Sequence, residues 1–389
     1  MYFRHLDKVL KNHFKKRREI LVLLGARQVG KTTILKKIFP SAFYLSVDNE
    51  PVRRNLNLFD VSVYRQMIPP VEKIIVIDEA HLLDDPGRVA KIFFDQIPDK
   101  KLILTGSSSF RIKNKTSESL AGRKIEYYLY PLTLLEYLNQ KNILSIEGFP
   151  ILENIIKKEN LEEKKYYSFD LEGVLDNLLV FGLYPALVNQ PNDVLYLKNL
   201  ADSVVFKDLL DLSLIENTQV AKDLLTLLAY QIGNLVNYSE LATKLRVDER
   251  TVKRYFQIFE QSFIIFTLPP YLGKKRDEIA KMRKVYFYDL GLRNSLIDNF
   301  KPVNIRVDEG ALFENFIIAE ILKENYYSGL GFNLYFWRTK QGAEVDLVLE
   351  KDDQLIGVEI KTHHKKLSKA FKNRFPWAKL VGVNKENFL

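Results

Sequence analysis

Short apolar runs alternate with helix-like stretches over the first third of the chain. Runs rich in β-branched and aromatic residues, each long enough for one strand, occupy residues 20–24, 43–47, 73–78, 101–105 and 125–130. Strands separated by helices pair in parallel and are covered by those helices on both faces. The pattern therefore predicts an α/β fold with a parallel sheet for residues 1–130.

The pattern changes after residue 131. The next stretch is rich in Leu, Lys and Glu at helical spacing, which predicts a helical lid or linker. Strand patterns return only after residue 262, and again from residue 334. Because 389 residues exceed one ordinary core, we expect several domains. The expected domains are 1–130, 131–216, 217–290 and 291–389.

Composition narrows the kind of site and the compartment. The chain has no cysteine, which excludes disulfides, zinc–thiolate sites and thiol nucleophiles. No apolar stretch reaches the roughly 18 residues of a membrane span, and charges interrupt the segment where a secretory signal would be apolar. We therefore expect a cytoplasmic protein without membrane contact.

Basic residues cluster in two places. The formal net charge is +9, and eight Lys or Arg residues without any acid lie between Lys361 and Lys385. Residues 15–18 form a second basic cluster. Such clusters either solvate a surface or bind a polyanion such as nucleic acid.

A phosphate-binding loop pattern lies between the first expected strand and a helix expected at 32–38. Its two glycines let backbone N–H groups curl around phosphates at a helix N-terminus, which favours anions. Lys31 then reaches the β- and γ-phosphates, and the Thr32 hydroxyl binds Mg²⁺. The alternative is a glycine-rich turn of structural use only. The residues expected to bind Mg-ATP are Gly25, Ala26, Arg27, Gln28, Val29, Gly30, Lys31, Thr32, Thr33 and Asp78.

An acidic strand end follows at residues 74–81, where four apolar residues precede Asp78 and Glu79. Open α/β sheets bind ligands at the carboxyl ends of their strands. We expect Asp78 to hold Mg²⁺ and Glu79 to polarise the attacking water. His81 is expected to support the site without taking part in catalysis.

Two further side chains are candidates for catalysis. Ser107, or else Thr105, follows the fourth strand and could sense the γ-phosphate, whereas a serine that caps a helix is the alternative. Arg123 precedes the fifth strand and could stabilise charge on the ATP of a neighbouring subunit. Its alternative role is a local ion pair.

These motifs together resemble the AAA-family ATPases of archaea and bacteria that carry an uncharacterised C-terminal region. The resemblance extends to residues 181–185, 310–316 and 344–346, so it covers nearly the whole chain. Many relatives have a glutamate at the position of Ala186, so an acidic role there is in doubt. The resemblance implies a homo-oligomeric machine driven by ATP, for which a hexamer is one ring size.

Residues 237–256 read as two helices with a turn between them, and Asp248 caps the second helix. Two strands follow, at 263–268 and 285–288, and enclose a basic loop. The two helices and this hairpin together predict a winged helix. Such domains bind DNA phosphates and base edges, but in ATPases they also serve as docking lids. The expected DNA-binding residues are Arg250, Lys253 and Arg254 on the helix and Lys274, Lys275 and Arg276 in the loop.

Carboxylates mark a hairpin near the C-terminus, with its turn at residues 352–353. Registering the strands on this turn makes paired residue numbers sum to 705, which sets Asp346 opposite Glu359. Facing carboxylates repel unless a cation lies between them. We therefore expect a second divalent metal bound by Asp346, Glu359 and Glu314, with Glu320 as the substitute for Glu314. Lys361 is expected to lie beside the attacking water. A salt-bridged surface is the alternative.

This arrangement resembles the PD-(D/E)xK nuclease fold, which includes Holliday-junction resolvases. The sequence therefore predicts an oligomeric AAA-type ATPase whose hydrolysis of Mg-ATP drives DNA binding or remodelling, with metal-dependent DNA cleavage as an added activity. The rival hypothesis is a nucleotide-gated switch that binds DNA or protein through a catalytically inactive nuclease-like domain. A small-molecule kinase would share the phosphate loop, but the sequence shows no acceptor pocket.

Overall fold

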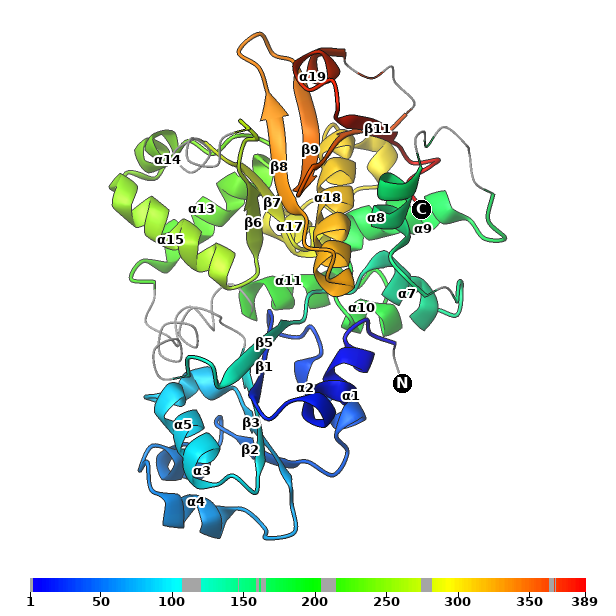
Figure 1. The fold of residues 1–389 in the computed structure, drawn as a ribbon. Helices are drawn as coiled ribbons and strands as arrows, with labels where there is room; N and C mark the ends of the chain where they lie inside the picture. Colours follow the sequence, from blue (N-terminus) through cyan, green and yellow to red (C-terminus); the bar gives the residue numbers. More distant parts are fainter. Residues whose placement is uncertain are drawn as a thin grey trace. The chain divides into compact units, whose positions relative to one another are not determined.

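The chain divides into two compact units in the computed structural model (Figure 1). Unit 1 comprises Met1–Leu132, Ser203–Glu216 and Gln257–Phe263, and unit 2 comprises Thr133–Asp202, Asn217–Phe256 and Ile264–Leu389. The structure describes residues 3–106, 120–145, 147–158, 161, 166–203, 215–273, 282–363, 367 and 369–389.

Unit 1 contains a five-stranded sheet in which every pairing is parallel, in the order β2-β3-β4-β1-β5. The strands are β1 (Ile20–Leu24), β2 (Phe43–Ser46), β3 (Ile74–Asp78), β4 (Lys101–Gly106) and β5 (Lys124–Tyr128). The helices are α1 (Asp7–Lys16), α2 (Lys31–Ile38), α3 (Glu50–Leu56), α4 (Val61–Met67), η1 (Ala80–Leu82) and α5 (Pro86–Gln96). This confirms the predicted α/β fold with a parallel sheet.

The strand order decides which loops meet. All five side chains of β1 are buried, as expected for a central strand covered on both faces. Figure 1 shows α1 and α2 on one side of the sheet and α3, α4 and α5 on the other. Because β4 lies between β1 and β3, its end separates the loop after β1 from the acids after β3.

Unit 2 contains a four-stranded sheet in the order β11-β10-β9-β8 and a two-stranded sheet of β6 and β7. Its strands are β6 (Ile265–Leu268), β7 (Lys284–Phe287), β8 (Asn333–Arg338), β9 (Glu344–Lys351), β10 (Gln354–Ile360) and β11 (Lys379–Val383). A cluster of buried side chains around Trp337, Val348 and Phe371 packs against the larger sheet.

The helices of unit 2 precede, separate and follow these strands. They are α7 (Leu134–Gln140), α8 (Pro150–Lys157), α9 (Leu171–Phe181), α10 (Ala186–Asn189), α11 (Val194–Asp202), α13 (Thr218–Tyr230), α14 (Tyr238–Leu245), α15 (Glu249–Gln261), α17 (Leu290–Leu296), η3 (Val303–Ile305), α18 (Glu309–Ser328) and α19 (Lys369–Arg374). The last five residues of α15 belong to unit 1. The finer division at residues 217 and 291 stays a prediction.

Helix α18 holds the beginnings of two other helices through buried carboxylates. Glu320 accepts a hydrogen bond of 2.7 Å from the backbone N–H of Leu134, at the start of α7. Glu324 accepts one of 2.7 Å from the N–H of Leu152, in the first turn of α8. Both carboxylates are almost fully buried. Since helix N-termini have free N–H groups and a positive dipole end, these contacts anchor α7 and α8.

No helix within the described residues is both long enough and apolar enough to cross a membrane.

Candidate functional site

Two glycines shape the loop between β1 and α2. A Cβ on Gly25 would lie 2.1 Å from the carbonyl oxygen of Leu129, so only glycine fits there. Gly30 has a φ of +93°, which other residues rarely adopt, and Gln28 is also left-handed at +60°. The loop therefore has the tight course that lets backbone amides converge on a phosphate.

Lys31 lies buried inside this loop. Its ammonium donates to the carbonyl oxygens of Gly25, at 3.0 Å, and Ala26, at 2.9 Å. Only 5% of the residue is exposed. The ammonium is thus positioned by the loop itself, where a phosphate would offer it a charged and stronger acceptor.

Arg4 supports the loop from the N-terminal segment, and the sequence pattern does not single it out. Its buried guanidinium donates to the carbonyl oxygen of Val29, at 2.9 Å, and to that of Tyr130, at 2.7 Å. These bonds connect the loop with the segment after β5. A lone arginine outside any motif gives no signal in the sequence that would have found it.

Asp78 is held from both sides at the end of β3. Its Oδ2 accepts a hydrogen bond of 2.9 Å from the Thr32 hydroxyl, and its Oδ1 accepts one from the Thr105 hydroxyl. The Thr105 oxygen also accepts the backbone N–H of Glu79, at 3.1 Å. Thr105 is fully buried, so it positions both acids. The alternative prediction of Thr105 as a phosphate sensor remains untested.

This donor set fits Mg-ATP. Thr32 and Asp78 bring a hydroxyl and a carboxylate oxygen together, and Mg²⁺ prefers oxygen ligands of this kind. The close approach of Gly25 to the Leu129 carbonyl oxygen holds the loop in a tight course that suits a backbone cradle for phosphate. The structure therefore brings together Lys31, Thr32 and Asp78 as the sequence predicted, with Ala26 and Val29 buried beneath.

Glu79 has a strained backbone and a stabilised charge. Its φ is +57°, an unusual value for a non-glycine residue and one that is common at active sites. His81 Nδ1 lies 3.1 Å from its Oε2. Burial acts to raise the pKa of Glu79, but His81 and the charges of Lys31 and Arg27 outweigh it and lower the pKa to about 2. Glu79 is thus a carboxylate at neutral pH.

Arg123 pairs with Asp95 of α5, with 3.2 Å between Nε and Oδ1. Each side chain is 35% exposed, so the pair lies at the surface. This contact is the local ion pair that was the alternative role for Arg123. Its action on the ATP of a neighbouring subunit stays a prediction. Ser107 lies outside the described residues.

The C-terminal hairpin has the predicted register. Five pairs of β9 and β10, from Lys351 with Gln354 to Leu347 with Val358, have numbers that sum to 705. Beyond them Asp346 Oδ2 accepts hydrogen bonds from the N–H of Ile360, at 2.7 Å, and from Lys361 Nζ, at 2.9 Å. Lys361, which was predicted to lie beside the attacking water, is therefore bound to the carboxylate of Asp346.

Glu314 and Glu344, two neighbouring acids, are bound to a buried lysine. Lys284 Nζ lies 3.4 Å from Glu314 Oε1 and forms an ion pair with Glu344. Glu314 also accepts a hydrogen bond of 2.7 Å from the Tyr286 hydroxyl. Burial acts to lower the pKa of Lys284, but Glu314 and Glu344 raise it above its ordinary value. Lys284 is thus a fixed cation within the cluster.

The predicted second metal at Glu314, Asp346 and Glu359 is not supported by this geometry. Within the described ranges, no group of three or more His, Cys, Asp or Glu side chains could hold a metal ion. The physical reason is that Lys284 and Lys361 already occupy the oxygens of Glu314 and Asp346. The substitute ligand Glu320 is engaged with Lys323 and α7.

Helix α15 presents the predicted basic side chains to solvent. Arg250, Lys253 and Arg254 are all exposed. Asp248 accepts the N–H of Thr251 at 2.7 Å, which confirms the predicted cap. Lys253 forms an ion pair with Glu249. Lys274, Lys275 and Arg276 lie outside the described residues.

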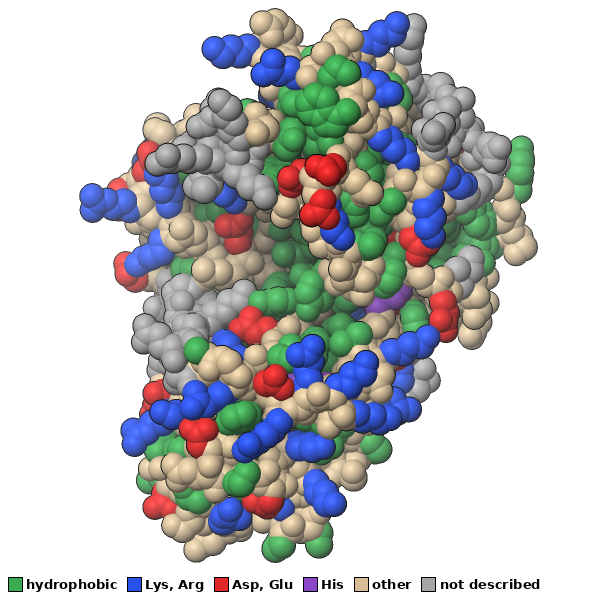
Figure 2. Space-filling model, viewed as in Figure 1, with side chains coloured by type: hydrophobic (Ala, Val, Ile, Leu, Met, Phe, Trp, Pro, Cys, Tyr) green, Lys and Arg blue, Asp and Glu red, His purple; other side chains and the backbone are tan. Residues whose placement is uncertain are grey.

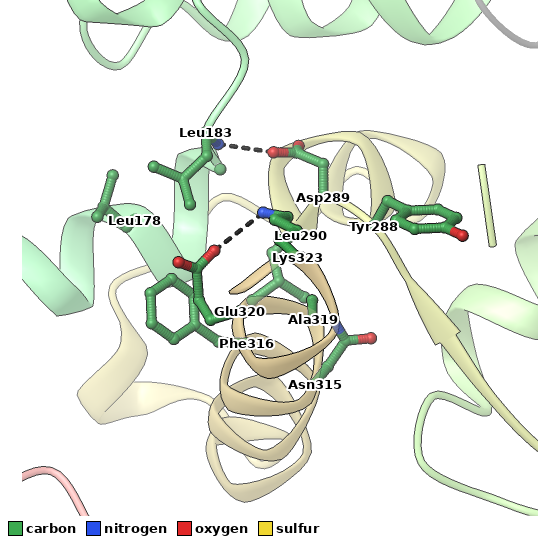
Figure 3. Close-up of a pocket in the computed structure, with 11 residues that line it drawn as sticks. Leu178, Leu183, Tyr288, Asp289, Leu290, Asn315, Phe316, Ala319, Glu320 and Lys323 are labelled. Atoms are coloured by element: carbon green, nitrogen blue, oxygen red, sulfur yellow. Dashed lines mark hydrogen bonds and ion pairs between the residues drawn. The ribbon is translucent and has the colours of Figure 1, made fainter. Parts of the chain in front are cut away.

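A small cavity in unit 2 is too small for a substrate. It is lined by Asp289, Glu320 and Lys323 among others, and Figure 3 shows Asp289 directed at the N–H of Leu183. Its volume is about 10 Å³, which is room for about one water molecule. Burial acts to raise the pKa of Asp289. These groups hold helices together and do not form a ligand pocket.

Basic side chains are also exposed on unit 1. Figure 2 shows Lys and Arg side chains spread over the visible face of α1 to α5. The cluster at residues 15–18, at the end of α1, is exposed. The surface of this unit therefore suits either an anionic partner or plain solvation, which are the two roles expected from the sequence.

Family models match three consecutive parts of the chain. Residues 17–138 match a model described as "AAA domain". Residues 173–303 and 309–387 match two models described as "Domain of unknown function". The first match contains the phosphate-binding loop, both acids and all five strands of the parallel sheet. Residues 17–138 therefore form an AAA-type P-loop domain.

Similar proteins occur in archaea and bacteria. An uncharacterized protein of Methanocaldococcus jannaschii is 25% identical over 370 residues, which cover 88% of this chain and 75% of that protein. An uncharacterized protein of Mycobacterium tuberculosis is 27% identical over 355 residues, which cover 89% and 70%. Among solved structures, the Walker-type ATPase of Pyrococcus abyssi is 14% identical, with coverage of 76% and 96% and a TM-score of 0.47.

Proposed function

We propose that this protein binds and hydrolyses Mg-ATP at the P-loop domain and couples the nucleotide cycle to DNA binding by unit 2. The observation that carries the proposal is the pair of hydrogen bonds that join Thr32 and Thr105 to Asp78. These bonds fix a metal-binding carboxylate beside a phosphate loop, with Glu79 on the next residue. A glycine-rich turn with only a structural role would need neither hydrogen bond.

Each residue has a role that follows from its contacts. The loop amides and Lys31 bind the β- and γ-phosphates, because Lys31 exchanges carbonyl partners for charged ones. Thr32 and Asp78 would hold Mg²⁺, which neutralises phosphate charge during transfer. Glu79, ionised at neutral pH, accepts a proton from the attacking water. Thr105 keeps Asp78 and Glu79 in place.

We interpret α13, α14, α15, β6 and β7 as a winged helix that contacts DNA. Three helices followed by an antiparallel two-stranded sheet have the element order of that domain. Arg250, Lys253 and Arg254 are exposed in the first two turns of α15, where they can reach phosphates. In this proposal the chain acts as a homo-oligomer, with Arg123 completing the site of a neighbouring subunit.

The ATP site is tested first, by nucleotide binding and turnover in a Lys31→Ala variant. We expect loss of measurable turnover and weaker ATP binding, because the loop loses the ammonium that it positions beside its own carbonyl groups. Lys36→Ala is the matched control, since Lys36 is an exposed lysine of the same helix. If Lys31→Ala binds and hydrolyses ATP like the unchanged protein, the proposal fails.

The DNA partner is tested by the ATPase rate with and without single-stranded, duplex and four-way DNA. We expect DNA to raise the rate, and Arg250→Ala to weaken binding and reduce its salt dependence by about one phosphate contact. Lys244→Ala on α14 is the control, because Lys244 is exposed but paired with Glu240. If none of the DNAs changes the rate or binds, a protein partner replaces DNA in the proposal.

A second candidate is a nucleotide-gated switch whose nuclease-like sheet does not cleave DNA. The observation that favours it is the engagement of Asp346 by Lys361 and of Glu314 and Glu344 by Lys284. In cleavage, Lys361 would be needed at water or phosphate. Comparing cleavage of plasmid and branched DNA with Mg²⁺ or Mn²⁺ between the unchanged protein and Lys361→Ala separates the two candidates, and the switch predicts no cleavage by either.

A further inference from the structure

Lys284 is a buried base at the centre of an acidic cluster. It lies on β7, and its side chain is only 4% exposed. Its ammonium lies 3.4 Å from a carboxylate oxygen of Glu314 on α18 and forms an ion pair with Glu344 at the start of β9. One side chain therefore binds acids from two separate elements of unit 2.

Two further bases of unit 2 also pair with acids of the cluster. Asp346 binds Lys361 at 2.9 Å, and Glu344 lies 3.6 Å from Nε of Arg338. Asp346 and Glu359 are both largely buried. Three bases, Lys284, Lys361 and Arg338, thus pair with three acids of the cluster, Glu314, Glu344 and Asp346.

A buried carboxylate needs a compensating cation, and either a metal ion or a base can supply it. A divalent ion would have to displace the ammonium of Lys284 from its carboxylate partners, and leaving a buried charge unpaired is strongly unfavourable. It would also meet an ammonium at close range, and like charges in a poorly solvated site repel strongly. Lys284 therefore opposes metal binding both sterically and electrostatically.

We propose that the ammonium of Lys284 takes the place of a divalent metal in the nuclease-like sheet. The cluster is then a permanently cation-filled site that contributes structure and not hydrolysis. By binding α18 and β9, Lys284 also fixes the two-stranded sheet to the segment that carries the carboxylates. This inference deepens the switch candidate but is independent of ATP turnover and of DNA binding.

The test measures Mn²⁺ binding to the full chain without nucleotide, and electron paramagnetic resonance quantifies the free ion. All proteins carry Asp78→Asn, which removes the carboxylate expected to hold metal at the phosphate loop. We expect this background to show no Mn²⁺ binding that depends on Asp346. Adding Lys284→Met, which keeps the length and loses the charge, is expected to tighten Mn²⁺ binding by at least about tenfold.

Two results would overturn the proposal. The first is Mn²⁺ binding by the Asp78→Asn background that disappears when Asp346→Asn is added, because the site would then accept metal with Lys284 in place. The second is a folded Lys284→Met protein that gains no Mn²⁺ affinity. If circular dichroism shows that Lys284→Met does not fold, the first comparison still decides. A gain that Asp346→Asn removes again supports the proposal.

Discussion

Replacing Thr105 by valine tests whether a buried hydroxyl holds the two acids at the end of β3, Asp78 and Glu79. Valine has nearly the same shape but can neither donate to Asp78 nor accept the N–H of Glu79. A hydrogen bond to a charged group contributes about 1.5–3 kcal/mol and a neutral one about 0.5–1.5 kcal/mol. Their sum predicts a loss of about 2–4.5 kcal/mol in the free energy of unfolding of unit 1.

The same change should weaken the metal site. Removing a group that orients a metal ligand lowers metal affinity or activity by roughly 10- to 100-fold. We therefore expect the Mg²⁺ concentration for half-maximal ATP hydrolysis to rise by about that factor. Chemical denaturation without nucleotide measures the loss of stability, and ATP turnover across a Mg²⁺ titration measures the loss of affinity.

Thr105→Ser is the matched control, because it keeps the hydroxyl and removes only a methyl group. Serine should retain the Mg²⁺ dependence of the unchanged protein and lose only part of its stability. The reasoning is refuted if Thr105→Val and Thr105→Ser behave alike in the Mg²⁺ titration. Equal stability losses with unequal Mg²⁺ dependence would still support the positioning role.

Three further changes address other parts of the ATP site. Gly25→Ala places a Cβ 2.1 Å from the Leu129 carbonyl oxygen, so we expect ATP binding to be lost in a titration calorimetry experiment; normal affinity would contradict the close approach. Glu79→Gln should lower turnover by about 10²- to 10⁴-fold while ATP still binds. Because the pKa of Glu79 is about 2 when folded and 4.5 otherwise, its contribution to stability is present above pH 4.5 and is lost as the pH falls toward 2. In the unchanged protein, turnover should therefore show no Glu79 titration between about pH 5 and 8, and an acidic limb near pH 4.5 would count against it. Asp95→Ala should lower the free energy of unfolding by at most about 1 kcal/mol and leave turnover intact. Arg123→Ala should slow turnover by about 10³-fold or more if Arg123 acts on a neighbouring subunit. Equal effects of the two changes on turnover would mean that Arg123 only forms its local ion pair.

The parallel sheet and its ATP site were predictable because their signals are local. An apolar strand, a glycine-rich turn and a helix start follow one another within residues 20–38. The acids at 78 and 79 are likewise marked by the strand that precedes them. The hairpin register was also predictable, since a two-residue turn fixes it.

The contacts that the sequence did not reveal join residues that are far apart along the chain. Lys284 reaches Glu314 and Glu344, and Arg4 reaches Tyr130, across separations that no periodic pattern reports. The expectation of a metal near Asp346 rested on charge repulsion between facing acids. In the structure Lys361, at the end of the same hairpin, binds Asp346. Lys284, from another strand, binds Glu314 and Glu344.

The carboxylates of α18 have a consequence for the order in which the protein is made. Glu320 and Glu324 contact N–H groups 186 and 172 residues earlier in the chain. During synthesis the parallel sheet is complete once residue 128 has left the ribosome, whereas the starts of α7 and α8 wait for α18. A nascent chain therefore presents a complete parallel sheet while the helices that follow it still lack their anchors.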